Sequence, residues 1–202
     1  MANEDSELPA HVAGKLGQFN RVLVSYVDFQ QARGIAGYIL AEHLHDRYPY
    51  DRFLLQGLNC GMIVAYCRPF SGNDRGAAVK IPDLPPRILQ TLTAEEREIH
   101  AIVMEDRNTV LAHSDSRAWD PRPQLHRARG RDILIPMFNS AHAPLTREVT
   151  EKFKTMCDKL REACFEERLR LEPELKPYLP VVEYDEEELK RFADERGVKW
   201  PT

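Results

Sequence analysis

The residues of this chain best suited to chemistry lie between Arg107 and Asp115, in the stretch RNTVLAHSD. The guanidinium of Arg107 could hold a phosphoryl group through its planar fork of donors. The imidazole of His113 could move a proton near neutral pH, and the Asn108 amide could orient either group. This combination suits phosphate chemistry. A plainer interpretation stays open, in which the same polar groups solvate the last carbonyls of a helix, where basic side chains are favoured by the helix dipole.

Two helices are expected before this stretch. Apolar residues recur at three- and four-residue steps from about 16 to 44, which predicts an amphipathic helix. Gly34 and Gly37 weaken that helix locally and would let a neighbouring helix approach closely. A second helix is predicted from about 51 to 67. Because it is apolar almost all round, we expect it to lie deep in the core. Residues 71–86, rich in Gly, Asp, Asn and Pro, should form an exposed connection.

The helix that carries Arg107 has a clear predicted start. Thr93 and Glu96 have the spacing of a capping box, and we expect the helix to end around His113. From 116 to 130 the composition turns to Arg, Pro and His, which predicts a loop. The apolar run 133–138 contains Pro136 and can therefore be at most a short or edge strand.

The C-terminal third should hold one long helix and one short one. Thr146 opens the long helix, and Pro173, Pro177 and Pro180 should break regular structure after it. A short helix is predicted from 185 to 195, ending at Gly197. These patterns together predict an all-α, up-and-down bundle of four to five helices with loop insertions and a short β segment near 133–138. We expect a single domain over 1–202, with a core bundle at about 16–172 and a C-terminal extension at 173–202.

The bulk composition limits the function. The net charge of −4 argues against a surface that wraps nucleic acid throughout, although a local basic patch stays open. No apolar run reaches the roughly 18 residues of a membrane span, and the acidic N-terminus does not resemble a signal peptide, so we expect a soluble, cytoplasmic protein with no membrane partner.

The four cysteines form two pairs, Cys60 with Cys67 and Cys157 with Cys164, each seven residues apart. On a helix that spacing separates the Cα atoms by roughly 10 Å, beyond the reach of a disulfide or a shared tetrahedral ion. We therefore expect reduced core cysteines, with no metal and no cofactor.

The segment RNTVLAH, an arginine followed at once by asparagine and closed by histidine six positions on, resembles the signature of the HEPN superfamily. The order of two long helices, a motif-bearing helix and a further helix also resembles these small helical bundles. The resemblance is closest to members associated with abortive infection or with toxin–antitoxin pairs. By architecture it covers about residues 16 to 171, and by motif seven residues.

This resemblance implies a metal-independent endoribonuclease, in which the ribose 2′-hydroxyl attacks its own phosphate. His113 would then be the general base or acid, Arg107 would stabilise the charge of the transition state, and Asn108 would orient the phosphate or the imidazole. The resemblance further implies RNA as substrate and, for a toxin, an antitoxin protein as partner.

The spacing of the motif raises a geometric question. Six residues along an ideal helix leave Arg107 and His113 roughly 120° apart around the axis. Either the helix ends before His113, or a second molecule completes the site. The resemblance implies the second route, a homodimer in which two motifs face one another across a two-fold axis.

Candidate substrate-binding residues lie in the expected loop. Guanidinium groups there would contact phosphates, and Trp119 could stack on an unpaired base. The candidates are Arg117, Trp119, Arg122 and Arg127, with Arg129 and Arg131 beside them. The same loop could equally be a solvated connection.

Two residues near the motif have structural interpretations. Arg68 could reach the motif, but we expect it to cap the second helix; His100, about two turns before Arg107, should be a partly buried structural histidine. For the whole chain, the main alternative function is a non-catalytic helical interaction module that binds a protein or RNA partner. Other enzyme classes are disfavoured, because the sequence has no P-loop, dinucleotide-binding glycine pattern, HExxH or nucleophile elbow.

Overall fold

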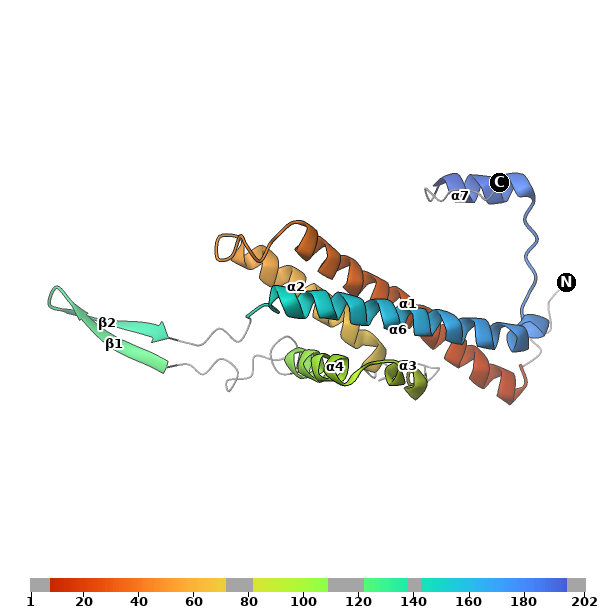
Figure 1. Cartoon of the computed structure of the whole chain (residues 1–202), viewed down its shortest axis with the longest axis horizontal. Coiled ribbons are helices and arrows are strands. Elements are labelled where there is room, and N and C mark those ends of the chain that lie inside the picture. Colours follow the sequence, from red (N-terminus) through yellow and green to blue (C-terminus); the bar gives the residue numbers. More distant parts are fainter. Residues whose placement is uncertain (1–7, 72–81, 109–121, 138–142, 196–202) are drawn as a thin grey trace.

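The computed structural model describes residues 8–71, 82–108, 122–137 and 143–195. Within these ranges the chain is a helical bundle with one small antiparallel sheet, which confirms the predicted fold class (Figure 1). The bundle is built by α1 (Ala10–Ala41), α2 (Arg52–Cys67), α4 (Ala94–Asp106) and α6 (Arg147–Leu175). Shorter elements are the 3₁₀ turns η1 (Arg68–Phe70) and η3 (Lys176–Tyr178), and the helices α3 (Pro86–Gln90) and α7 (Glu186–Glu195).

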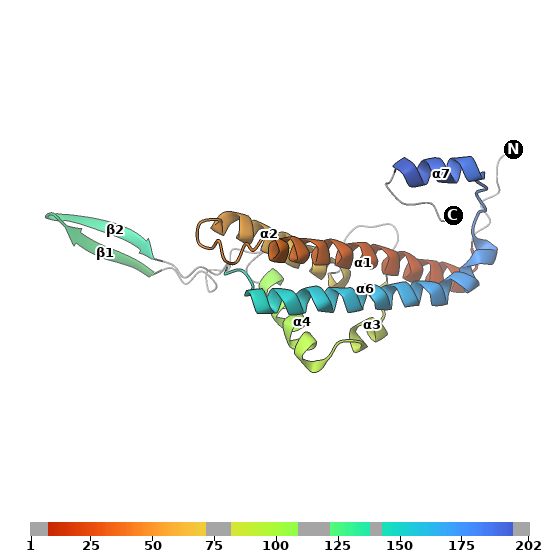
Figure 2. The same cartoon turned by 45° about the horizontal axis from the view of Figure 1, so that its top comes forward.

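The two longest helices, α1 and α6, lie side by side and run antiparallel (Figures 1 and 2). Ion pairs show the register, because partners on α6 fall in number as those on α1 rise. Lys15 pairs with Glu174 and Arg33 with Asp158. Such partly exposed pairs add little stability each, so the buried apolar side chains hold the two helices together.

An aromatic cluster occupies the centre of the core. The ring of Tyr66, from α2, lies 5.0 Å from that of Phe153 on α6 and 5.7 Å from that of Phe29 on α1, measured between centroids. All three side chains are fully buried. A smaller apolar cluster at the far end of α1 and α6 joins Val12 to Leu171 and Leu175.

Several helix boundaries differ from the sequence-based ones. The first helix begins at Ala10, not 16, and ends at Ala41, not 44. The short helix α3, which begins with Pro86, was not expected. The long helix α6 does not stop at Pro173 but continues to Leu175. Burial of Leu171 and Leu175 against Val12 offsets the one backbone hydrogen bond that Pro173 removes.

The expectation that the second helix lies deep in the core is wrong. One face of α2 is buried, with Leu55, Met62 and Tyr66 on it, but the opposite face is open to solvent. Phe53 on that open face is 83% exposed. An apolar side chain there gains nothing from this fold, which makes the outer face of α2 a surface that needs an explanation.

The segment expected as a loop from 116 to 130 is in part a strand. Residues β1 (Arg122–Ala128) and β2 (Arg131–Met137) form an antiparallel hairpin, in which Leu125 faces Leu134. Arg129 and Gly130 both have positive φ, the backbone conformation of a tight two-residue hairpin turn. The short edge strand predicted at 133–138 is confirmed as β2. Figures 1 and 2 show the hairpin standing clear of the helices.

The chain leaves the bundle after Tyr178, whose ring lies 6.5 Å from that of His11. The last helix, predicted at 185–195, is α7, and its expected end at Gly197 lies outside the described residues. Figures 1 and 2 show α7 apart from the other helices. No helix in the described part of the chain is both long and apolar enough to cross a membrane.

The cysteines are free thiols, as expected. Cys67, Cys157 and Cys164 are buried, and Cys60 is half-buried. Burial raises the pKa of the Cys67 and Cys164 thiols to about 12. These groups therefore stay protonated at neutral pH and act as core side chains.

Candidate functional site

The motif arginine lies at the C-terminal end of α4. A capping box starts this helix: the Glu96 N–H donates to the Thr93 hydroxyl at 3.2 Å, and the Thr93 N–H donates to the Glu96 carboxylate at 2.8 Å. The helix ends at Asp106, earlier than the expected end around His113. Asp106, Asn108 and Thr109 follow one another closely there, and short polar side chains of this kind compete with the helical backbone.

The Arg107 side chain is half-buried and is joined to its neighbour. One of its guanidinium nitrogens, Nη1, donates to the Asn108 amide oxygen at 2.8 Å. The Arg107 N–H donates to the carbonyls of Val103 and Met104, so its backbone is still anchored to α4. The structure therefore brings together two of the three predicted catalytic residues. The third, His113, lies outside the described residues, as do Arg117 and Trp119.

The end of α2 provides the surroundings of Arg107. The Cys67 thiol donates to the Val103 carbonyl of α4 at 3.7 Å. Burial raises the pKa of this thiol, and the nearby positive charge of Arg107 lowers it only in part. A guanidinium that acts on a buried thiol in this way is in a site of reduced polarity, where its field is stronger than in water.

His100 lies on the same stripe of α4 as Val103 and Arg107. Its Nδ1 is 2.8 Å from the Tyr66 hydroxyl, and its ring stacks edge-on against Phe70 with centroids 4.8 Å apart. Burial lowers the pKa of His100, which favours the neutral imidazole. The expectation of a partly buried structural histidine agrees with this position.

Arg68 does not cap α2, contrary to the expectation. Its Nη1 donates to the Asp28 carboxylate at 3.2 Å and to the Gln31 amide oxygen at 3.0 Å, so it ties η1 to α1. Burial raises the pKa of Asp28, and the charges of Arg68 and Arg21 oppose that rise. The sequence gave no reason to pair Arg68 with Asp28, which lies forty positions earlier.

The remaining predicted substrate residues, Arg122 and Arg127, lie on β1 and are exposed. Arg127 forms a two-pronged contact with Asp132 of β2, at 2.7 and 3.1 Å. The Arg127 hydrogen bond lowers the pKa of the Asp132 carboxyl. Because β1 stands clear of α4 in Figures 1 and 2, the structure does not bring these arginines to Arg107.

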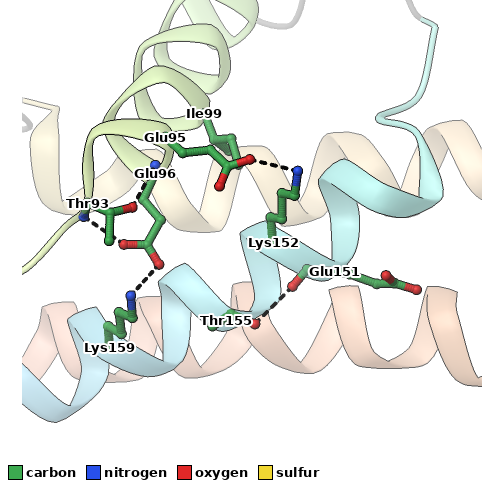
Figure 3. Close-up of a pocket in the computed structure, with 8 residues that line it drawn as sticks. All are labelled: Thr93, Glu95, Glu96, Ile99, Glu151, Lys152, Thr155 and Lys159. Atoms are coloured by element: carbon green, nitrogen blue, oxygen red, sulfur yellow. Dashed lines mark hydrogen bonds and ion pairs between the residues drawn. The ribbon is translucent and has the colours of Figure 1, made fainter.

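A pocket of about 350 Å³ lies elsewhere, between the start of α4 and the middle of α6 (Figure 3). Its charged groups already face one another: Lys152 lies 2.7 Å from Glu95, and Lys159 lies 2.7 Å from Glu96. This pairing neutralises the pocket and joins α4 to α6. It therefore positions the helix that carries Arg107 and does not itself offer a reactive group.

The described residues include no group of three or more His, Cys, Asp or Glu side chains that could hold a metal ion. What they do assemble is a guanidinium and an amide at a helix end, beside a neutral imidazole. Comparison with family models, with curated proteins and with solved structures finds no match to this chain.

Proposed function

We propose that the protein is a metal-independent endoribonuclease of the HEPN type, acting as a toxin or as an effector of phage defence. One observation carries the proposal: Arg107, the first residue of the motif, ends a capped helix of an all-helical bundle and is hydrogen-bonded to Asn108, the second. The resemblance of RNTVLAH to the HEPN signature gives these residues their proposed roles.

In the proposed reaction the 2′-hydroxyl of a ribose attacks the adjacent phosphorus. The 2′-proton passes to a base, a P–O bond forms, and the bond to the 5′-oxygen breaks as that oxygen takes up a proton. The products are a 2′,3′-cyclic phosphate and a 5′-hydroxyl. His113 transfers the proton, and Arg107 stabilises the extra negative charge of the transition state.

The geometry of Arg107 supports this role. Its contact with Asn108 restricts the guanidinium, so less freedom is lost when a phosphate binds. To the described residues it donates this one side-chain hydrogen bond, whereas Arg68 is held by both Asp28 and Gln31. Arg107 is therefore the better of the two for binding a phosphate.

The proposal includes a homodimer with a two-fold axis near the end of α4, so that two motifs share one groove. Because α4 ends at Asp106, the chain beyond it need not continue the helical spacing that separates Arg107 from His113. RNA is the proposed substrate, and an antitoxin is the proposed partner of a toxin. A strict monomer in sedimentation at micromolar concentration would contradict the shared site.

The proposal is tested by incubating the purified protein with mixed RNA in EDTA and identifying the ends of the fragments. We expect cyclic phosphate and 5′-hydroxyl ends with the wild type, and loss of cleavage with Arg107→Ala and His113→Ala. Arg97→Ala is the matched control, because Arg97 is exposed on the same helix and outside the motif. RNA binding without cleavage by the wild type would instead indicate the non-catalytic interaction module.

A further inference from the structure

The outer surface of α1 and α2 carries six exposed apolar side chains that pack against nothing in this fold. We refer to them as the α1–α2 face: Val24, Val27, Tyr38, Phe53, Leu54 and Val64. On each helix these residues recur at three- and four-residue steps or their multiples, so each set forms a stripe. An apolar surface of this size on a water-soluble bundle usually marks a binding site.

The two stripes line the same seam. Arg68 of η1 reaches the exposed Gln31 of α1 across it, and a Cβ placed on Gly61 would lie 3.7 Å from Ile35. Side chains beside these contacts therefore share one surface. At Gly34 and Gly57 a Cβ would meet no atom within 4 Å, so the seam is shallow and open. Gly37 contacts Lys154 of α6 instead.

The same chain carries a second unpartnered apolar surface in its C-terminal arm, residues 179–195. Its exposed apolar side chains are Leu179, Val181, Val182, Tyr184 and Phe192, and Val181 is 83% exposed. Within the arm, α7 is preceded by Asp185, which forms a capping box with Glu188. The helix is therefore stable in its own right at its first turn, although its apolar side contacts no other helix in Figures 1 and 2.

Charge makes the arm and the face complementary. Between Asp185 and Glu195 the arm has six acidic and two basic residues. The exposed positions of the two stripes hold no carboxylate, and Arg52 and Arg68 lie at their two ends. An acidic amphipathic helix fits such a surface better than a second copy of the surface does, because self-pairing would bring like charges together.

We propose that the C-terminal arm docks on the α1–α2 face of a second copy, so that two chains exchange arms. The face and the arm together expose on the order of 1,000 Å² of apolar side chain, more than the roughly 800 Å² per partner of a stable interface. The face alone, on the order of 600 Å², falls short of that area. The exchange is independent of the nuclease proposal.

A chain cannot cover its own face in this way. The arm starts beside His11, because Tyr178 contacts that residue, whereas Tyr38 lies roughly 40 Å further along α1. The seven linking residues 179–185 span at most about 25 Å, and the path along α7 to Phe192 adds about 10 Å. Phe192 therefore stops short of Phe53, which lies beyond Tyr38 at the far end of the bundle.

Two variants at one position test the charge of the occupant. Gly57→Glu and Gly57→Lys place side chains of similar length in open space and favour the helix equally, so neither endangers the fold. In sedimentation velocity of the full chain, we expect Gly57→Glu to weaken self-association on the order of tenfold or more, and Gly57→Lys to preserve it. Equal weakening by both would overturn the acidic arm as occupant in favour of face-to-face pairing.

A mixing experiment tests the exchange itself. We expect the arm variant Val181→Asp/Phe192→Asp and the face variant Gly57→Glu each to lose self-association alone. Mixed together they should form a heterodimer, because the intact arm of one fits the intact face of the other. A wild-type assembly that neither variant weakens, or a mixture that stays as two separate monomers, would refute arm exchange. RNA cleavage assayed on the same samples reports on the nuclease proposal separately.

Discussion

The Tyr66 hydroxyl lies 2.8 Å from Nδ1 of His100 and so links the core end of α2 to the middle of α4. Tyr66 is fully buried, and burial raises its pKa far above the ordinary value, so its hydroxyl stays protonated. The contact fixes α4 two turns before Arg107. A change there should therefore be felt both in stability and at the motif.

Removal of the hydroxyl in Tyr66→Phe should destabilise the fold by about 1–2 kcal/mol, because the buried imidazole loses its partner. Urea unfolding measures this change. Tyr38→Phe is the matched control, since Tyr38 is half exposed on α1 and should stay within about 0.5 kcal/mol of the wild type. Equal losses for the two variants would show that the contact with His100 contributes nothing.

Stability should depend on pH through His100. Burial lowers the pKa of this residue in the folded protein, so the unfolded chain takes up a proton at a higher pH than the folded one. The contribution of the neutral imidazole is complete above the ordinary pKa of 6.5 and is lost as the pH falls toward the lower folded value. His100→Gln should flatten this slope in urea unfolding between pH 5 and 7.5. Parallel slopes for wild type and variant would contradict the assignment.

Thr93→Ala should cost about 1 kcal/mol, because it removes one half of the capping box that begins α4. Thermal or urea unfolding measures the loss. Thr155→Ala makes the same chemical change within α6, where the hydroxyl only donates to the Glu151 carbonyl. That control should be neutral or slightly stabilising, since alanine is the better helix former. A cost as large at Thr155 would remove the special role of the cap.

The hairpin can be tested as an RNA contact through Asp132. Asp132→Asn removes the negative partner of Arg127, so RNA binding should strengthen if the hairpin touches phosphates. Arg129→Gln/Arg131→Gln should weaken binding and lower its dependence on salt. Filter binding at several salt concentrations measures both changes. If neither variant alters affinity, the hairpin has no part in binding RNA.

Features set by local sequence were predictable, and those set by distant contacts were not. The Thr93–Glu96 box marked the start of α4 because both halves lie within one turn. The pairing of Tyr66 with His100 joins residues 34 positions apart and depends on how α2 meets α4. Arg107 and Asn108 were found from their types alone, whereas the electrostatic contact of Arg107 with Cys67 required the packed bundle.

The errors also have physical causes. Arg129-Gly130 forms a tight turn because both residues accept positive φ, but an arginine at the first position is an unusual sign of a hairpin. The apolar composition of α2 was interpreted as depth in the core. The structure places part of it, including Phe53 and Val64, on the outside, and composition cannot distinguish a buried face from one that awaits a partner.

The rate of RNA cleavage in EDTA, compared between wild type and Arg107→Ala at equal folded fraction, tests the central proposal most directly. The account predicts that the wild type cleaves and that Arg107→Ala is slower by about 10²–10³-fold, the usual cost of removing one donor that stabilises a transition-state charge. Equal rates for the two proteins, or no cleavage by freshly prepared wild type on any RNA, would contradict it.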